Sequence, residues 1–358
     1  MTGTVRIVGA GLLGSSIGLA LSQNGVDVAL ADTSPAQLRL AIDYGAGRAA
    51  ADDDAPQVVV VCVPPDVVAD VVAAELARFP DAVVTDVASV KLGPLDQLRA
   101  RGADLAHYIG SHPMAGRERG GAISARADLF AGRPWVVCRD GETSARDLSL
   151  IEDIALDLGA VLIEMTPEEH DRSVALVSHV PQVVASLLAA RFAEAPEMSL
   201  TLAGQGVRDT TRIAHSAPEL WVQILAANAG PIVEQLDALA ADLTRVADAL
   251  RAPDAPGARR TTADAIRSGN VGVERLPGKH GQRRRFETFV VMIDDSAGQL
   301  GRLFGDLGEI AVNVEDFRLE HSPGAPLGLA EIAVDPSILQ AAVDGLTSRG
   351  WRIASTSD

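Results

Sequence analysis

The stretch VRIVGAGLLG at residues 5–14 decides the fold of this chain. Its first four residues are typical of a buried strand, and the apolar run that follows the glycines is typical of a helix. In such a strand-loop-helix, Gly9 permits the tight turn, Gly11 lets the backbone approach a pyrophosphate, and Gly14 allows close packing of helix on strand. The stretch therefore predicts a dinucleotide-binding (Rossmann) domain of the α/β class.

The next predicted strand, residues 26–31, ends at Asp32. A carboxylate in that place accepts hydrogen bonds from the adenosine ribose and repels a 2′-phosphate. Thr33 and Ser34 follow it, so no arginine is immediately at hand for a phosphate, although Arg39 stands a little further along. The pattern favours NAD over NADP. The residues expected to bind the cofactor are Gly9, Gly11, Leu12, Leu13, Gly14 and Asp32.

The composition restricts the class of protein. The chain has 358 residues, enough for two or three domains, and 48 acidic against 31 basic residues give a formal charge of −17. Net negative charge disfavours binding to nucleic acid and anionic membranes. Cys62 and Cys138 lie in apolar runs, typical of small core residues in a reducing compartment. The chain has no signal-peptide pattern and no stretch long and apolar enough to span a bilayer without glycine and polar interruption. We therefore expect a cytoplasmic protein.

Four segments differ in pattern along the chain. Strand and helix patterns alternate at first, which predicts a doubly wound sheet of parallel strands buried on both faces. An Ala- and Leu-rich helical segment begins at the capping box of Thr166, and its wide apolar stripes predict a homodimer. The next segment, rich in Pro, Gly and Arg, is typical of a linker with one short helix near residues 261–267. The expected domains are 1–166 (dinucleotide-binding), 167–252 (helical, substrate and dimerisation), 253–285 (linker) and 286–358 (regulatory).

The last segment has strand and helix patterns in β-α-β-β-α-β order, which predicts a ferredoxin-like unit. It carries no catalytic cluster. Asp295 and Gly298 lie in a loop before a helix, and Asn313 lies where a turn enters the next strand. Together these residues would hold the charged ends of an amino acid. The alternative is that they are ordinary turn and cap residues.

A second informative stretch is GSHPMAG at residues 110–116. It sets an imidazole in a loop framed by Pro and Gly after a short strand-like run. A histidine with a pKa near neutral takes the proton from an alcohol as a hydride leaves its carbon. Beside a dinucleotide loop, His112 therefore predicts redox chemistry on a hydroxyl group. Taken alone, a loop histidine is more often solvated or structural.

Further stretches follow in a fixed order, and with them the chain resembles the prephenate dehydrogenase family of tyrosine biosynthesis over nearly its whole length. The C-terminal segment resembles an ACT domain, a kind that senses amino acids. A generic hydroxy acid dehydrogenase would supply the glycine loop and few of the others. The stretches are GAGLLG at 9–14, TDVASVK at 85–91, SHPMAG at 111–116, LFAGRPW at 129–135, HD at 170–171, SHVP at 178–181 and DTTRI at 209–213.

The resemblance implies oxidative decarboxylation of prephenate, or of its transaminated form arogenate, with hydride passing from the ring carbinol carbon to NAD. Loss of the ring carboxylate as carbon dioxide then makes the ring aromatic. It implies that His112 is the general base and that Ser89 orients the histidine, the hydroxyl and the nicotinamide; a helix N-cap is the alternative for Ser89. Lys91 would position an anionic group or be a solvated surface lysine.

Three further residues are expected at the substrate. Arg212 would bind a substrate carboxylate, because a dianion in an acidic protein needs a planar bidentate cation; an exposed helix arginine is the alternative. By resemblance, Glu118 would pair with Arg212 and gate the site, or it is an exposed loop carboxylate. Trp221 stands where the family places an aromatic residue near the substrate, with core packing as the alternative.

His179 and Gln182 are three apart on one predicted helix face, whereas His170 points to nearly the opposite face. These residues are therefore not expected to share a metal ion. Many family members have a substrate-contacting histidine where this chain has Gln182. Because glutamine is neutral and both donates and accepts, the choice between a pyruvyl and an alanyl side chain stays open. We place prephenate first, as the commoner substrate of this architecture.

Two other classes of function compete with this interpretation. Another Rossmann dehydrogenase, acting on a short hydroxy acid, would give no reason for Ser89, His112 and Arg212 to occur in this order. A non-catalytic sensor would have degraded positions there, yet all three are intact. The ACT resemblance implies tyrosine as a feedback effector. Residues 294–298 read DDSAG where many such domains have Asp-x-Pro-Gly, so phenylalanine or no ligand remain alternatives.

Overall fold

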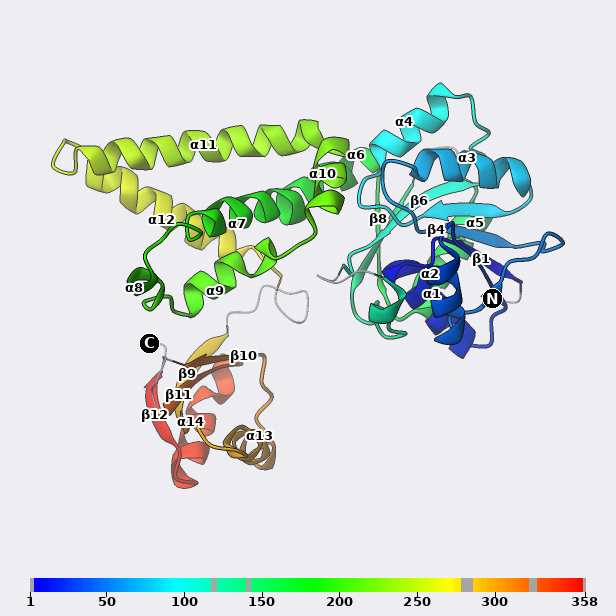
Figure 1. Ribbon diagram of the computed structural model, residues 1–358. Coiled ribbons are helices and arrows are strands. Elements are labelled where there is room, and N and C mark those ends of the chain that lie inside the picture. The colour runs from blue at the N-terminus through cyan, green and yellow to red at the C-terminus, as the bar shows by residue number, and fades with distance from the viewer. Residues whose placement is uncertain (1–2, 117–120, 140–142, 278–285, 322–326, 357–358) are drawn as a thin grey trace. The chain divides into compact units, whose positions relative to one another are not determined.

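The computed structural model describes residues 3–116, 121–139, 143–277, 286–321 and 327–356 (Figure 1). The chain forms two compact units. Unit 1 comprises Met1–Ala193 with Thr211–Leu239, and unit 2 comprises Glu194–Thr210 with Ala240–Asp358. The described residues that we expect to bind cofactor or substrate belong to unit 1, and the three residues expected to bind an effector belong to unit 2.

Unit 1 is built on an eight-stranded sheet in the order β3-β2-β1-β4-β5-β6-β7-β8. Neighbouring strands are parallel except for β6 and β7, so the expectation of an entirely parallel sheet is wrong at that pair. The strand order reverses between β1 and β4, the point at which open α/β sheets bind ligands. The strands are β1 Val5–Val8, β2 Val28–Ala31, β3 Arg48–Ala49, β4 Val58–Val61, β5 Val83–Asp86, β6 Tyr108–Pro113, β7 Pro134–Cys138 and β8 Val161–Met165.

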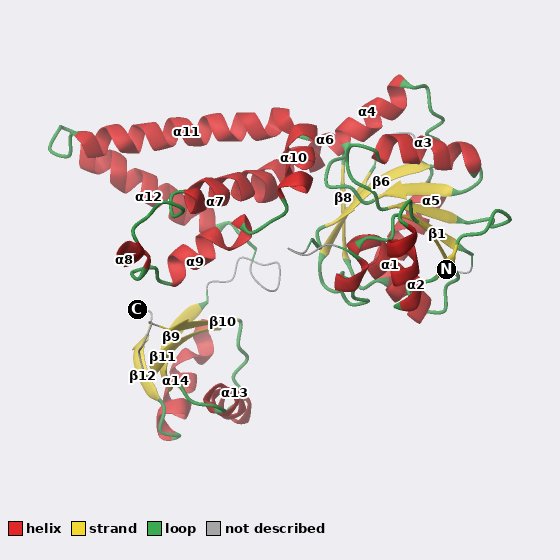
Figure 2. Cartoon of the chain, in the orientation of Figure 1, coloured by secondary structure: helices red, strands yellow, loops and turns green. Residues whose placement is uncertain are grey.

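Helices cover both faces of this sheet (Figure 2). The central strand β4 shows the reason, because all four of its valines are fully buried. Val58 and Val60 pack into one hydrophobic core with α1 and α5, while Val59 and Val61 pack into the other with α3 and α4. The predicted doubly wound α/β class is therefore confirmed. The helices are α1 Leu12–Gln23, α2 Pro35–Asp43, α3 Val68–Arg78, α4 Leu92–Ala100 and α5 Ala145–Asp157.

The predicted capping box starts the helical segment. The Thr166 hydroxyl accepts a hydrogen bond from the backbone N–H of Glu169, and the Glu169 carboxylate accepts one from the backbone N–H of Thr166. This satisfies two N–H groups that helix geometry leaves without partners. The helix continues unbroken through three elements, α6 Pro167–Val174, the π-helical turn η2 Ala175–His179 and α7 Val180–Ala190.

This continuous run of 24 residues, Pro167–Ala190, is long and apolar enough to cross a membrane by length and composition alone. Polar residues interrupt the run, as we expect of any apolar stretch of this length in the chain. His170, Asp171 and His179 on this run are buried and hydrogen-bonded within unit 1. Buried polar groups with protein partners are typical of a helix packed in a domain rather than in lipid.

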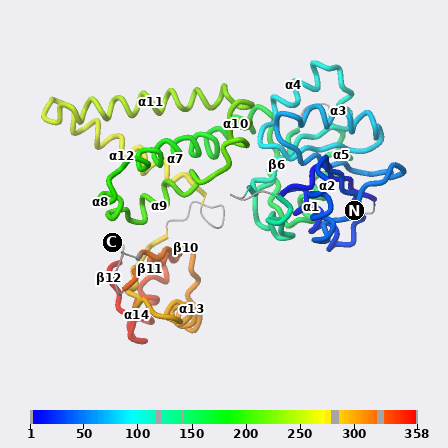
Figure 3. Tube along the Cα trace, in the orientation of Figure 1, coloured from blue at the N-terminus to red at the C-terminus, as the bar shows by residue number. Residues whose placement is uncertain are grey.

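Further helices complete the middle of the chain, and the 23-residue α11 turns back into α12 (Figure 3). The interpretation of residues 253–285 as a linker with one short helix is wrong over α12, which has 17 residues. Its glycines and threonines have low helix propensity and its side chains are mostly exposed, so the local pattern gave little helical signal. Residues 278–285 lie outside the described part. The elements are α8 Glu197–Leu200, α9 Gln205–Thr211, η3 Arg212–Ala214, α10 Pro218–Ala227, α11 Ala229–Arg251 and α12 Ala258–Glu274.

The C-terminal part of unit 2 has the predicted β-α-β-β-α-β order and an antiparallel sheet in the order β10-β11-β9-β12. Asp295 and Gly298 lie in the loop before α13, where Gly298 adopts a left-handed φ of 91°. The Asn313 amide donates to Glu315 at 2.7 Å. An amino-acid site at these residues stays a prediction. The elements are β9 Glu287–Asp294, α13 Gln299–Glu309, β10 Asp316–His321, β11 Leu327–Val334, α14 Leu339–Ser348 and β12 Arg352–Thr356.

Candidate active site

The glycine loop after β1 has the geometry that a dinucleotide requires. Gly9 has a φ of 104°, and a side chain there would lie 2.3 Å from the carbonyl oxygen of Cys62. A methyl group at Gly14 would lie 1.9 Å from the carbonyl oxygen of Gly9. At Gly11, by contrast, it would meet no atom within 4 Å, so the backbone at the start of α1 faces open space. The first and third glycines are needed for the fold, and the second leaves room for a pyrophosphate.

Asp32 follows β2 at the same edge of the sheet. Its carboxylate accepts hydrogen bonds from the backbone N–H groups of Ala10 and Ser34, both at 2.7 Å. These two bonds hold the carboxylate against the glycine loop and leave acceptor capacity on both oxygens. This is the place in which a ribose hydroxyl is bound in dinucleotide folds.

A fully buried carboxylate, Asp86, organises the end of β5. One of its oxygens accepts from the Lys91 ammonium and from the backbone N–H of Ala88, and the other accepts from the Tyr108 hydroxyl at 2.7 Å. Lys91 also donates to the carbonyl oxygen of Ser111 at 2.7 Å. The lysine is 1% exposed, so the interpretation of Lys91 as a solvated surface residue is wrong. Its ammonium supports the strand that carries His112.

His112 lies in strand β6, paired with Val136 of β7, and not in the loop that the Pro and Gly residues indicated. It is 8% exposed. Its Nδ1 atom lies 2.9 Å from Nε2 of His170, whose own Nδ1 atom lies 2.7 Å from the carboxylate of Asp171. Burial and the neighbouring histidines and lysine hold the pKa of His112 well below its usual value. The imidazole is therefore neutral at physiological pH, as a general base must be.

Ser89 is half-buried in the loop between β5 and α4. The alternative of a helix N-cap is wrong, because α4 begins at Leu92 and Lys91 occupies the cap position. The cap is supplied from α6, since the Asp171 carboxylate accepts the backbone N–H groups of Lys91 at 2.8 Å and Leu92 at 3.0 Å. Asp171 thus joins the helical segment to the loop that carries Ser89.

His179 enters the same region from η2. It is almost fully buried, and its Nδ1 lies 3.1 Å from the amide nitrogen of Asn228, which also donates to the backbone oxygen of Asp171 at 2.8 Å. Since the amide nitrogen is a donor, Nδ1 of His179 accepts and its proton is on Nε2. Burial lowers the pKa of His179 to about 4. The ring packs edge-on against Trp221, with centroids 6.1 Å apart.

The expectation that His170 and His179 face nearly opposite ways assumed a regular α-helix, and the helix between them is not regular. The Asn228 amide contacts His179 and also the backbone oxygen of Asp171, the neighbour of His170. The π-helical turn between them supplies the physical reason, because its wider turn shifts the residues that follow it around the helix axis. Such turns occur frequently at functional sites, and this one directs His179 toward the residues of α6.

The remaining substrate candidates lie on α7 and the elements around it. Gln182 is buried, and its amide nitrogen donates to the Ser216 hydroxyl at 2.8 Å and to Ser186 at 3.3 Å. Arg212 is exposed at the start of η3, which packs against α7. Glu118 lies outside the described residues. A substrate contact by Gln182, Arg212 or Trp221 stays a prediction.

Sequence reasoning gave no role to His170 and Asp171, although both stood in a recognised stretch. Their contacts join positions far apart in the chain, 58 residues between His170 and His112 and 80 between Asp171 and Lys91. The signal available in the sequence was the pair itself, directly after a capping box.

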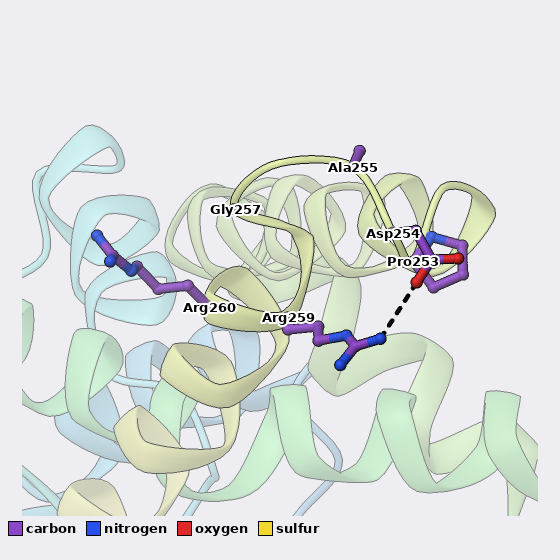
Figure 4. Close-up of a pocket in the computed structure, with 6 residues that line it drawn as sticks. All are labelled: Pro253, Asp254, Ala255, Gly257, Arg259 and Arg260. Atoms are coloured by element: carbon purple, nitrogen blue, oxygen red, sulfur yellow. Dashed lines mark hydrogen bonds and ion pairs between the residues drawn. The ribbon is translucent and has the colours of Figure 1, made fainter.

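A surface hollow elsewhere, lined by Pro253, Asp254, Ala255, Gly257, Arg259 and Arg260 between α11 and α12, contains none of the expected site residues (Figure 4).

Comparisons with known proteins identify the family. Residues 17–164 match the family model described as "Prephenate dehydrogenase, nucleotide-binding domain", and residues 166–263 match "Prephenate dehydrogenase, dimerization domain". A Streptomyces niveus protein named "Probable prephenate dehydrogenase NovF" is 35% identical over 356 residues, 97% of this chain and 98% of its own length. The chain belongs to the prephenate dehydrogenase family.

Two further relatives agree with this assignment. A cyclohexadienyl dehydrogenase of Zymomonas mobilis is 32% identical and covers 70% of this chain and 89% of its own. The solved structure of the prephenate dehydrogenase from A. aeolicus, in complex with hydroxyphenyl propionate and NAD+, is 26% identical with a TM-score of 0.67. It covers 76% of this chain and 97% of its own. The resemblance inferred from the sequence motifs is confirmed, and with it an oxidoreductase.

The glycine loop generates a paired prediction. Gly11→Ala should raise the dissociation constant for NAD by roughly tenfold or more, because the methyl group occupies the space of the pyrophosphate, while the melting temperature stays unchanged. Gly14→Ala should lower the melting temperature as well, because its methyl group meets the Gly9 carbonyl. Cofactor titration and thermal unfolding measure both. Unchanged NAD affinity in Gly11→Ala would remove the loop from the cofactor site.

The buried pair generates a second prediction. Lys91→Met leaves the Asp86 carboxylate buried without its cation, so the free energy of unfolding should fall by about 3–5 kcal/mol in denaturant titration. The matched control is Arg101→Met, which removes an exposed pair with Asp70 and should cost at most about 1 kcal/mol. Equal effects of the two substitutions would contradict a structural role for Lys91.

Proposed function

We propose that this protein oxidises prephenate with NAD and decarboxylates it to 4-hydroxyphenylpyruvate. The observation that carries the proposal is the position of His112, a buried and neutral imidazole near the carboxyl end of β6. Strands β1, β4, β5 and β6 are parallel neighbours, so their carboxyl ends share the edge of the sheet at which the glycine loop opens. A base at that edge meets a substrate carbon that faces the cofactor.

The residues of the loop fit NAD. The open space at Gly11 accepts the pyrophosphate at the start of α1, and Asp32 is placed for the ribose and against a 2′-phosphate. NAD, when bound, takes the hydride from the ring carbinol carbon. The solved structure of the A. aeolicus relative, which is in complex with NAD+, supports this cofactor.

The chain's own residues would handle the proton and the substrate charge. His112 takes the hydroxyl proton as the hydride departs, and Ser89 in the neighbouring loop orients the histidine and the hydroxyl. When the ring carboxylate leaves as carbon dioxide, the electron pair of the broken C–C bond passes through the ring to the former hydroxyl oxygen. That oxygen then takes the proton back. The substrate, cofactor and products balance with no net proton released. Arg212 binds a carboxylate of the substrate.

Gln182 makes arogenate the second candidate. Its amide nitrogen is engaged with Ser216 and Ser186, so its carbonyl oxygen is the atom left to accept from a donor such as the ammonium group of an alanyl side chain. Prephenate remains first because it is the substrate named for the family. A short hydroxy acid as substrate is a weaker alternative, because it gives no reason for Ser89, His112 and Arg212 to occur together in this order.

We further propose that the subunits form a homodimer through residues 167–252. Exposed apolar side chains on α7 and α11, among them Leu187, Val233 and Leu243, support this together with the dimerization-domain match. The ferredoxin-like domain at 286–358 would act as an ACT domain that binds tyrosine at Asp295, Gly298 and Asn313. We also propose a cytoplasmic location, small-molecule partners alone, and a boundary near residue 166 between the dinucleotide-binding and helical domains.

The test is NADH formation by the purified protein with prephenate and separately with arogenate, each with NAD or NADP and with or without tyrosine. We expect turnover of prephenate with NAD. Preference for arogenate would identify the second candidate and point to Gln182 as a determinant of specificity. No turnover of either compound would refute the proposal.

Two variants separate the catalytic and binding roles. His112→Asn should bind NAD normally and lose kcat by about 10²–10⁴-fold, because the general base is gone. Arg212→Ala should raise KM about 10–100-fold with a smaller effect on kcat, because a charge-assisted bond to the substrate is lost. Arg191→Ala, an exposed arginine after α7, is the control. A normal kcat in His112→Asn, or a normal KM in Arg212→Ala, would end the respective assignment.

A further inference from the structure

Three buried groups form a hydrogen-bonded chain from the interior to the proposed base. Asp171, His170 and His112 follow one another at 2.7 Å and 2.9 Å, and His170 has no exposed surface. The Asp171 carboxylate also accepts the backbone N–H groups of Lys91 and Leu92 at the start of α4. Two backbone N–H groups at a helix N-terminus thus point at this one carboxylate, which accepts from both.

The ionised carboxylate determines where each proton lies. It has only lone pairs, so Nδ1 of His170 carries the hydrogen that points to it. In a neutral imidazole, Nε2 of His170 is then an acceptor, and the hydrogen between the two rings belongs to Nδ1 of His112. The remaining nitrogen of His112, Nε2, is left with a bare lone pair. That nitrogen is the atom that would meet the substrate hydroxyl.

We propose that His170, anchored by Asp171, is a positioning residue that fixes this tautomer of His112 and holds a proton between the two half-steps of the reaction. This inference rests on the proposed function, in which the proton of the ring hydroxyl is removed and later returned. As Nε2 of His112 takes the hydroxyl proton, Nδ1 passes its own proton to Nε2 of His170. His112 is again neutral, and His170 becomes an imidazolium paired with Asp171. Decarboxylation then draws the protons back in reverse order.

The surroundings favour His170 as the place where the proton waits. Asp171 is hydrogen-bonded to His170 and not to His112, and its charge offsets part of the lowering of the His170 pKa that burial causes. The pKa of His112 is held further down by burial, His170, Lys91 and His179. Two other charged groups act on His170: Lys91 lowers its pKa, and Asp86, which is paired with Lys91, raises it. A positive charge is thus stabilised more strongly on the inner ring than on the outer one.

Two substitutions separate the two parts of this role. His170→Gln keeps an amide oxygen where Nε2 accepts from His112, so the tautomer is retained but no proton can be held. His170→Asn keeps a donor toward Asp171 and loses contact with His112, so the proton of His112 is no longer held on Nδ1. His107→Gln is the control, because His107 also bonds a carboxylate, Asp147 at 2.7 Å, away from the site.

We expect His170→Gln to leave KM and NAD affinity within about twofold and to lower kcat about 10–100-fold, and His170→Asn to lower kcat about 10³-fold. The acid limb of the kcat profile should move to lower pH in His170→Gln, because the group that first takes a proton is absent. A purely structural role would lower stability without moving that limb. A normal kcat with an unmoved limb in His170→Gln would overturn the proposal.

A spectroscopic measurement decides the tautomer without any substrate. Long-range proton–nitrogen correlation spectra of the ¹⁵N-histidine-labelled protein should show His112 protonated on Nδ1 in the wild type and in His170→Gln, and released in His170→Asn; spectra of His112→Asn assign the signals. A wild-type His112 protonated on Nε2 would overturn the inference even if prephenate is turned over. Absence of turnover with the expected tautomer would refute the proposed function alone.

Discussion

The carboxylate of Asp171 is the contact on which the arrangement of the site depends. It accepts the ring N–H of His170 and the two backbone N–H groups that begin α4, while its own carbonyl oxygen accepts the amide of Asn228. A buried charge is tolerated only where hydrogen-bond donors surround it. The donors to this carboxylate come from α6 and from the start of α4. The α6 helix, the loop before α4 and the start of α11 are thereby fixed relative to one another.

Lys91 connects this carboxylate to a second buried charge. Its backbone N–H is bound by Asp171, and its ammonium is bound by Asp86 at the end of β5. The short loop that carries Ser89 therefore has one end on the sheet and the other held by the helical segment. Because Lys91 also donates to the backbone of Ser111, the same side chain fixes the strand position next to His112. Precise placement of side chains in a site requires this kind of support from the residues around them.

The features that the sequence predicted well are those encoded locally. The glycine loop, the capping box at Thr166 and the β-α-β-β-α-β order depend on residues within a few positions of one another, and all are found in the structure. We expected His112 in a loop because the neighbouring Pro and Gly residues are typical of loops. It lies in a strand instead, because β6 pairs antiparallel with β7, where its partner is Val136, 24 positions further along the chain. The helix α12 was missed because its residues have low helix propensity.

The site residues show the same division. His112 and Ser89 could be proposed as site residues because their stretches are contiguous, but the charge pair of Lys91 and the contacts of His170 depend on the tertiary fold. No pattern within a window of residues reveals that a lysine five positions after an aspartate turns inward to it, since the same spacing is common on solvated surfaces. The π-helical turn was also invisible, and with it the direction of His179.

The burial of the histidines is consistent with the charge balance of the proposed reaction. When a hydride leaves the substrate, the positive charge of the nicotinamide is lost, and the proton taken by His112 places one positive charge on the imidazoles. Charge therefore moves within the enclosed site and none has to enter from solvent. An interior of low dielectric strengthens each interaction with that charge, and Asp171 is the fixed counter-charge at the end of the path. Since the ring oxygen recovers its proton when carbon dioxide is lost, a base that is shielded from water is an advantage, because the borrowed proton cannot exchange away before it is needed.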